Sequence, residues 1–283
     1  KFWFTGMKSG IQMVNAFLGL ALLLAPGVSR AADSTPRGWT TDSVMARSRA
    51  ILSGKELLIC FTWEVECQAS RQFIRHYLSD HGLTRHLQST YELVLVDLSG
   101  RSDHDQSHLL RDEYTVSTFP TIVLADGGGM PWAFTGLRPG SVEDFKRHLD
   151  DLWYQEAERR TLLAEAGELT GTERAEVLAE SLPSLGKPRT AHFYGDMMRE
   201  AIALDPNHEI AAVSRLATQL RDLKYNESMQ ALEIEEDWDG MIACTNSYIA
   251  ANEMDDSRRQ IALMNRYVIH RRLSDLEGAW KTL

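Results

Sequence analysis

A single cysteine, Cys67, stands where a strand-like apolar run gives way to a helical pattern, in the segment FTWEVECQAS of residues 61–70. A thiol at the start of a helix meets the positive end of the helix dipole and backbone N–H groups without a partner inside the helix, and both lower its pKa. Because the thiolate is the reactive form of cysteine, this position predicts a sulfur nucleophile. Ser70, three residues further on, is placed to donate a hydrogen bond to that thiolate.

The chemistry expected of such a thiolate is disulfide exchange, but the segment lacks a second thiol. A thiolate attacks one sulfur of a disulfide to form a mixed disulfide, which another thiol then breaks. Ser70 stands where that thiol would be and cannot perform this step, so an external thiol must release the substrate. Nearby Glu64 and Glu66 disfavour the Cys67 thiolate, and Arg71 offsets their charge in part. The site therefore predicts either exchange through one thiol or an unreactive, structural cysteine.

The segments around Cys67 alternate between strand and helix patterns. Continuous apolar runs of strand length predict strands covered on both faces, and capping residues before amphipathic segments predict helices. Strands are predicted at residues 56–62, 91–98, 121–125 and 132–135, and helices at 42–52, 68–78, 105–114 and 141–153, with Thr41 or Asp42 and Ser141 as caps.

This order of elements, with one cysteine and a later proline, resembles the thioredoxin family. FTWEVECQAS is similar to the F-T-G-S-D-W-C-x-x-C site of secreted thioredoxin-like proteins, with Phe61, Thr62 and Cys67 matching and Ser70 replacing the second cysteine. VSTFPT, at residues 116–121, resembles the family's V-x-x-x-P-T segment. Over residues 45–153 the resemblance implies an α/β thioredoxin-like domain with a central mixed sheet flanked by helices.

The resemblance also implies a substrate groove beside the cysteine. In the family, the proline of the V-x-x-x-P-T segment follows a cis peptide bond and shapes a peptide-binding groove. For this chain it implies a cis Phe119–Pro120 bond, with Trp63, Phe119 and Pro120 contacting the substrate. It places Cys60 where many thioredoxins keep a buried acid that assists proton transfer. A neutral thiol replaces that acid poorly, and we expect Cys60 to be a small buried apolar residue.

From residue 154 to residue 283 the strand patterns stop, and an all-α helical domain is predicted, with breaks at Gly167, at 183–188, at 205–207 and near Asn252. The segment 199–207, REAIALDPN, resembles the end of a tetratricopeptide helix pair, which implies a surface for a protein partner. No second copy follows one period later, so a plain helical appendage stays open. In the last helix a buried stripe is expected at Ile269, Leu273, Leu276 and Trp280.

The N-terminus has the pattern of an export signal. An apolar core, AFLGLALLLA at residues 16–25, precedes a Pro-Gly break and small residues suited to cleavage after Ala31. Residues 1–31 are therefore predicted to be a signal peptide with upstream residues, and 32–44 an N-terminal arm. The apolar core is short for a membrane span, although an uncleaved anchor stays open. An exported protein, periplasmic or secreted and free of the membrane after cleavage, is expected.

Composition excludes several classes of function. The formal net charge of −10 argues against a nucleic-acid partner. The three cysteines, Cys60, Cys67 and Cys244, fit neither a disulfide framework nor a zinc pattern. The loop DHDQSH at 103–108 is interpreted as a solvated helix start rather than a metal site, and the acidic run EIEEDWD at 233–239 as a solvated face. The sequence indicates no cofactor.

These patterns favour an exported thioredoxin-family protein that exchanges protein thiols and disulfides through Cys67. The alternative is a redox-inactive thioredoxin-fold scaffold that binds other proteins. The two differ in what they require of Cys67. Exchange needs an accessible thiol with a lowered pKa, whereas a scaffold tolerates a buried or inert one.

Overall fold

The computed structural model describes residues 35–99, 104–250 and 256–282. The predicted signal peptide at residues 1–31, Asp103 and the predicted break near Asn252 lie outside these ranges. Among the described helices, none combines the length and the apolar character needed to cross a membrane.

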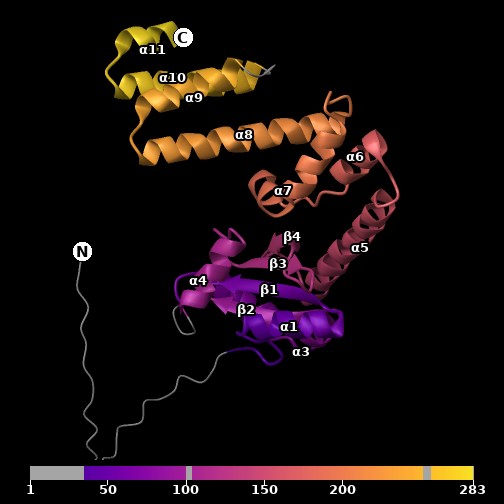
Figure 1. The fold of residues 1–283 in the computed structure, drawn as a ribbon. Helices are drawn as coiled ribbons and strands as arrows, with labels where there is room; N and C mark the ends of the chain where they lie inside the picture. The colour runs from indigo at the N-terminus through magenta and orange to yellow at the C-terminus, as the bar shows by residue number, and fades with distance from the viewer. Residues whose placement is uncertain (1–34, 100–103, 251–255, 283) are drawn as a thin grey trace, which may run out of the picture. The chain divides into compact units, whose positions relative to one another are not determined.

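Four strands form one mixed sheet at the centre of residues 35–153 (Figure 1). They are β1 (Glu56–Thr62), β2 (Tyr91–Asp97), β3 (Thr121–Ala125) and β4 (Pro131–Gly136), in the order β2-β1-β3-β4. β1 runs parallel to β2 and antiparallel to β3, and β3 pairs with β4 antiparallel. All four strands fall where the sequence predicts them.

Helices cover both faces of the sheet, as in a thioredoxin-like fold. Alternation along β1 sends Leu57, Ile59 and Phe61 to one face and Leu58 and Cys60 to the other. The first face packs on α1 (Ser43–Ser53) and α4 (His104–Glu113). The second packs on α2 (Gln68–Phe73), the π-helical turn η1 (Ile74–Leu78), α3 (His81–Leu87) and α5 (Val142–Ala166). The predicted fold class is confirmed.

Local capping chemistry sets several helix starts. Asp42 precedes α1, and its carboxylate accepts a hydrogen bond from the Met45 N–H at 2.8 Å. At α5, Ser141 and Asp144 form a reciprocal capping box, in which each side chain accepts from the other's backbone N–H. Both caps are readable from the sequence, because a short polar oxygen before an amphipathic segment satisfies N–H groups that lack intrahelical partners.

Two residues of the predicted N-terminal arm, Trp39 and Thr40, lie against the sheet. The Trp39 side chain is buried in the core between the sheet and α3. Thr40 forms a parallel bridge with Val94, in which its N–H donates to the Leu93 carbonyl and its carbonyl accepts from Leu95. These residues therefore extend the open edge of β2, which their small, polar composition does not indicate.

The predicted end of the fourth helix at Trp153 is wrong, because α5 continues without a break to Ala166. The sequence offers no glycine or proline between these positions, and Gly167 follows the last helical residue. The boundary predicted between residues 153 and 154 therefore falls inside one helix. The first half of α5 packs on the sheet, and its end joins the helical core beyond.

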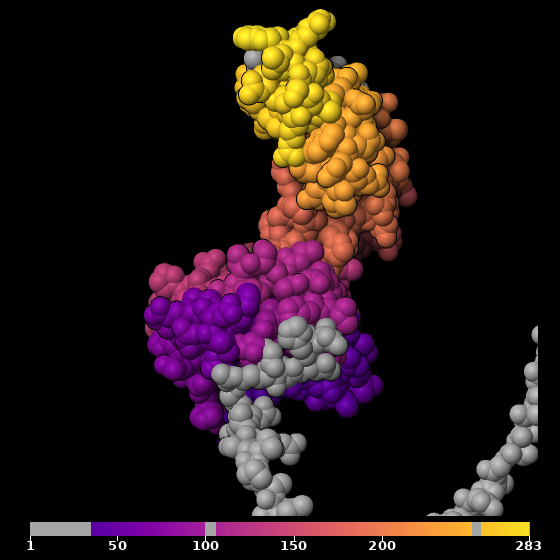
Figure 2. Space-filling model, turned by 90° about the vertical axis from the view of Figure 1, so that its left-hand side faces the viewer, coloured from indigo at the N-terminus to yellow at the C-terminus, as the bar shows by residue number. Residues whose placement is uncertain are grey.

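The remaining helices pack in chain order, each mainly on the next. They are α6 (Gly171–Glu180), α7 (Lys187–Leu204), α8 (Ala211–Ile234), α9 (Trp238–Ala250), α10 (Asp256–Arg272) and α11 (Leu276–Thr282). Figure 2 shows α8 to α11 in orange to yellow, packed against one another. In the Asp-Pro-Asn loop before α8, the buried Asp205 carboxylate accepts from the N–H groups of Glu209 and Ile210 at 3.1 and 2.9 Å.

The buried stripe predicted for the last helix is wrong beyond Ile269. α10 ends at Arg272, and Ser274 adopts a left-handed φ of 57° that interrupts the helix. The Asp275 carboxylate then accepts a hydrogen bond from the N–H of Gly278. Because α11 is a separate helix, the spacing of the buried residues in α10 does not continue into it. Leu276 and Trp280 are consequently 58% and 75% exposed, while Ala279 and Thr282 take the buried positions. The acidic side chains of the run at residues 233–239 are exposed, as expected. The run includes the turn that follows the end of α8.

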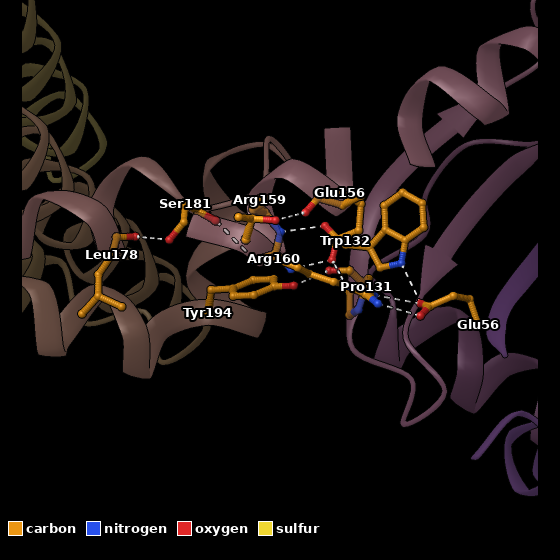
Figure 3. A network of polar contacts seen from close by, with 11 residues as sticks. Glu56, Pro131, Trp132, Glu156, Arg159, Arg160, Leu178, Ser181 and Tyr194 are labelled. Atoms are coloured by element: carbon orange, nitrogen blue, oxygen red, sulfur yellow. Dashed lines mark hydrogen bonds and ion pairs between the residues drawn. The ribbon is translucent and has the colours of Figure 1, made fainter. Parts of the chain in front are cut away.

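A network of buried ion pairs joins β1 to α5 (Figure 3). Glu56 opens β1, and its carboxylate accepts two hydrogen bonds from the Arg160 guanidinium at 2.9 and 3.0 Å. Glu156, which is 3% exposed, accepts from Arg160 at 2.7 Å and twice from Arg159 at 2.7 and 2.8 Å. Trp132 Nε1 completes the set by donating to Glu56 at 3.2 Å.

The network extends beyond α5 to the helices that follow. Arg159 Nη1 donates to the carbonyl of Ser181, which ends α6, at 3.3 Å. The Tyr194 hydroxyl on α7 donates to the Pro131 carbonyl of β4 at 3.1 Å. Elsewhere on α7, Arg189 donates to the Thr115 carbonyl at 3.0 Å and lies over the Phe134 ring at 4.3 Å. Polar contacts therefore connect the sheet to α5, α6 and α7.

Candidate functional site

Cys67 lies at the carboxyl-terminal end of β1, immediately before the first residue of α2. Its backbone is extended, with φ −106° and ψ 110°, and its side chain is partly exposed as a free thiol. In the thiol form, Sγ donates to the Phe119 carbonyl across a gap of 3.4 Å. The predicted nucleophile therefore stands at an accessible helix start, next to the residue that precedes Pro120.

The surroundings of the sulfur lower the pKa of the Cys67 thiol. Partial burial acts to raise this pKa, but groups of three neighbouring residues act to lower it. The Ser70 hydroxyl and the backbone N–H groups of Ser70 and Ala69 stabilise the thiolate, and the positive charge of Arg71 adds to their effect. Hydrogen bonds and an opposite charge that favour the ionised form lower an acid's pKa, so they outweigh the desolvation of the sulfur.

Ser70 is fully buried under the loop that leads to Cys67. Its oxygen accepts a hydrogen bond from the Trp63 backbone N–H at 3.1 Å. A hydroxyl has one hydrogen to donate and two lone pairs that accept. The Trp63 contact uses a lone pair, so the O–H of Ser70 stays available to the sulfur. The residue that replaces the second thiol thus both supports the loop and favours the thiolate.

Three residues expected to contact the substrate lie around Cys67. The Phe119–Pro120 peptide bond is cis and Pro120 is buried. The rings of Trp63 and Phe119 meet edge to face, with centroids 5.7 Å apart. Trp63 and the neighbouring Val65 are exposed and Phe119 is half-buried, so an apolar rim lies beside the sulfur.

Hydrogen bonds that sequence reasoning did not predict hold the loop between β1 and α2. Arg71 Nη1 donates to the carbonyls of Glu64 and Val65 at 2.7 and 2.8 Å. The Val65 N–H donates in turn to Ser99 Oγ at 3.0 Å. Asp97, which ends β2, accepts from the N–H of Ser99 at 3.1 Å. The carboxyl ends of parallel strands meet at one edge of a sheet. The polar residues at the end of β2 could therefore have indicated that they lie next to the loop after β1.

The other two cysteines lack these features. Cys60 is fully buried between the sheet and its helices, and burial strongly raises the pKa of its thiol. Cys244 on α9 is half-buried, and burial raises its thiol pKa as well. Both are free thiols, like Cys67. Of the three, Cys67 alone has its thiol pKa lowered.

The described part of the chain contains no group of three or more His, Cys, Asp or Glu side chains arranged to hold a metal ion. The loop considered for a metal begins at Asp103, which lies outside the described residues.

No protein-family model matches this chain, and no curated protein matches it either. Among solved structures, a DsbH oxidoreductase is similar over 45% of this chain and 93% of its own, at 16% identity and a TM-score of 0.38. A thioredoxin from Thermus thermophilus is similar over 42% of this chain and 87% of its own, at 21% identity and a TM-score of 0.34. At these levels the two likenesses do not indicate what this chain binds or does.

Proposed function

We propose that this protein exchanges thiols and disulfides with protein substrates through Cys67 as its single nucleophile. The observation that carries the proposal is the accessible thiol at the start of α2, whose pKa is lowered by Ser70, Ala69 and Arg71. A nucleophilic thiol needs both access and thiolate character, and Cys67 combines the two.

The proposed reaction has two displacements. On ionisation Cys67 gives up its hydrogen bond to the Phe119 carbonyl, and the thiolate attacks one sulfur of a substrate disulfide. A Cys67–substrate disulfide forms, and the other substrate sulfur leaves as a thiolate that takes up a proton. A low-molecular-weight thiolate then attacks the substrate sulfur of the mixed disulfide, so the bond to Cys67 breaks, the Cys67 thiolate returns and the substrate leaves bonded to the small thiol. Ser70 supplies a hydrogen bond but no second sulfur.

The rim of Trp63, Phe119 and Pro120 is proposed to hold the substrate chain against the sulfur. The exposed Trp63 and half-buried Phe119, whose rings are in contact, offer apolar surface beside Cys67. Burying aromatic surface contributes strongly to binding. Trp63→Ala is accordingly expected to weaken substrate capture without changing the reactivity of Cys67 toward a small disulfide.

Reaction with an aromatic disulfide that releases a coloured thiolate tests the exchange. The protein should release one equivalent quickly, Cys67→Ala should abolish that phase, and Cys244→Ala should keep it. Adding a low-molecular-weight thiol should regenerate Cys67. A fast phase that survives in Cys67→Ala would show that Cys67 is not the nucleophile.

A redox-inactive scaffold is the second candidate. The specific observation in its favour is that Ser70 accepts from the Trp63 N–H and so has a structural role that requires no redox chemistry. This candidate predicts that Cys67→Ala retains every interaction of the protein. Disulfide-linked complexes that form in the wild type and disappear in Cys67→Ala would contradict it.

We also propose that the protein works outside the cytoplasm after cleavage behind Ala31, as residues 1–31 suggest. Sequencing the N-terminus of the exported protein tests this. The division into domains at residues 45–153 and 154–283 and the tetratricopeptide-like motif likewise remain proposals, and α5 spans the proposed boundary.

A further inference from the structure

The helices beyond α6 enclose a groove that the exchange reaction at Cys67 does not use. Side chains of α8, α9 and α10 line it, together with Pro188 of α7. Its volume is about 720 Å³, which lies within the range of pockets that bind ligands. Every lining residue belongs to the described part of the chain.

The lining of the groove is largely apolar. Three helices contribute Leu223, Met229, Met241, Val268 and Ile269. Met241 and Ile269 are buried, whereas the Val268 side chain is 46% exposed and therefore accessible within the groove. Methionine side chains adapt to apolar partners of different shapes, and Trp238 adds an aromatic surface of the kind that anchors bound proteins. The groove therefore suits apolar side chains.

Amide side chains lie among these apolar groups. Asn226 and Gln230 stand one turn apart on α8, and within the described residues neither has a hydrogen-bond partner. Across the groove, Asn265 on α10 donates to the Tyr225 hydroxyl at 3.3 Å. A side-chain amide both donates and accepts hydrogen bonds, which matches the alternating C=O and N–H groups of a peptide backbone.

The charge of the lining is negative. Glu227 makes no ion pair with any described residue. Arg272 supplies positive charge but is already engaged: Nη1 lies 3.6 Å from Glu233 Oε1, and the guanidinium lies over the Trp238 ring at 5.0 Å. Next to Glu233, the turn before α9 adds the exposed acids Glu235, Glu236 and Asp237, and the first turn of α9 adds Asp239. This end of the groove therefore favours a cationic ligand.

We infer that this groove binds a peptide segment that combines apolar side chains with basic ones. The apolar lining supplies binding energy through removal of apolar surface from water. The free amides match the peptide backbone, and Glu227 with the acidic turn favours Lys or Arg over Asp or Glu. The inference does not rest on the redox reaction, since no part of the groove touches Cys67.

Fluorescence anisotropy with three labelled peptides tests the inference on the full chain. The probes are peptides of equal length composed of Leu and Lys, of Leu and Glu, and of Ser and Lys. The Leu/Lys peptide should bind, and raising the salt concentration should weaken it. The Leu/Glu and Ser/Lys peptides should bind at least about ten-fold more weakly, because each lacks one of the two complementary features.

Substitutions with matched controls locate the site. Val268→Asn should weaken Leu/Lys binding at least about ten-fold, whereas Ile261→Asn, on α10 but outside the groove and 63% exposed, should leave it unchanged. Glu227→Gln should weaken it about two- to five-fold, and Glu176→Gln on the surface of α6 should have no effect. Circular dichroism confirms that each variant is folded, and Glu227→Gln gives a second test that does not alter the packing.

Three results would overturn the inference. One is equal affinity for the Leu/Lys and Leu/Glu peptides, and another is undiminished Leu/Lys binding in Val268→Asn. The third is self-association of the chain in sedimentation that Val268→Asn abolishes, which would make a second copy of the chain the occupant. Retained Leu/Lys binding in Cys67→Ala is expected, and it keeps this test separate from that of the exchange reaction.

Discussion

At the junction of β1 with α5, four partly or fully buried charged side chains form ion pairs with one another: Glu56, Glu156, Arg159 and Arg160. At Cys67, by contrast, one partly exposed sulfur lies among hydrogen-bond donors. Glu156 is almost fully buried and held by two guanidinium groups. The Cys67 thiolate is stabilised by a hydroxyl, two backbone N–H groups and one nearby arginine. The charges at the junction are held in ion pairs, whereas the sulfur carries a charge only as the thiolate.

This difference indicates separate roles for the two regions. A buried ion pair is costly to break, because removing one partner leaves the other uncompensated. A partly exposed thiol supported by dipoles can ionise, react and be regenerated while its surroundings stay in place. β1 connects the two, since Glu56 begins the strand and Thr62 ends it five residues before Cys67. The junction holds the start of the strand, and the loop after the strand carries the proposed nucleophile.

The largest effect is expected from removing a charge at the junction. Glu156→Gln leaves Arg159 and Arg160 without their shared carboxylate and should lower the free energy of unfolding by about 3–5 kcal/mol. Urea unfolding followed by circular dichroism measures this. Glu158→Gln, an exposed neighbour on the same helix, should change it by less than about 0.5 kcal/mol. Equal effects of the two substitutions on the free energy of unfolding would contradict the claim that the ion pairs at the junction stabilise the protein more than a surface charge does.

A smaller effect is expected from removing the Ser70 hydroxyl beside Cys67. Ser70→Ala removes the hydroxyl that favours the Cys67 thiolate, so the pKa of Cys67 should rise. Alkylation near neutral pH should slow by about three- to ten-fold. The control is Ser89→Ala, which alters an exposed serine in the turn after α3. An unchanged rate in Ser70→Ala would mean that the hydroxyl does not act on the sulfur.

The smallest effect is expected at Arg71, whose charge is close to Cys67 but only half-buried. Arg71→Gln should slow alkylation of Cys67 about twofold, since exposed charges interact weakly. Arg71→Lys keeps the charge but loses the paired hydrogen bonds to the carbonyls of Glu64 and Val65. If the charge acts on the sulfur, the lysine variant should react faster than the glutamine variant. Identical rates would assign Arg71 to loop support alone.

The sheet and its first helices were predictable because their signals are local. Apolar runs marked β1, β2 and β3, and Asp42 and the Ser141–Asp144 capping box marked helix starts. The cis Phe119–Pro120 bond was expected from the family resemblance, and the structure confirms it. Long-range contacts were not predictable. Nothing near Arg160 in the sequence indicates that its partner is Glu56, on the first strand.

The helices beyond residue 153 were predicted less well for a related reason. Apolar spacing alone placed Leu276 and Trp280 in a buried stripe, but the left-handed Ser274 begins a new helix and turns both outward. The positive φ of Ser274 carries no strong sequence mark, unlike a glycine. At the candidate site, Cys67 and Ser70 were identified from the sequence, while the loop support from Asp97 and Ser99 required the pairing of β1 with β2.

The most direct test of the central claim is the pH dependence of Cys67 alkylation, measured in the protein with Cys60→Ala and Cys244→Ala. The rate follows the thiolate fraction, so it reports the pKa of Cys67 itself. An apparent pKa clearly below about 8.5, the ordinary value of a free thiol, is predicted. An apparent pKa at or above that value, or no labelling until denaturant is added, would contradict a reactive single thiol and favour the scaffold.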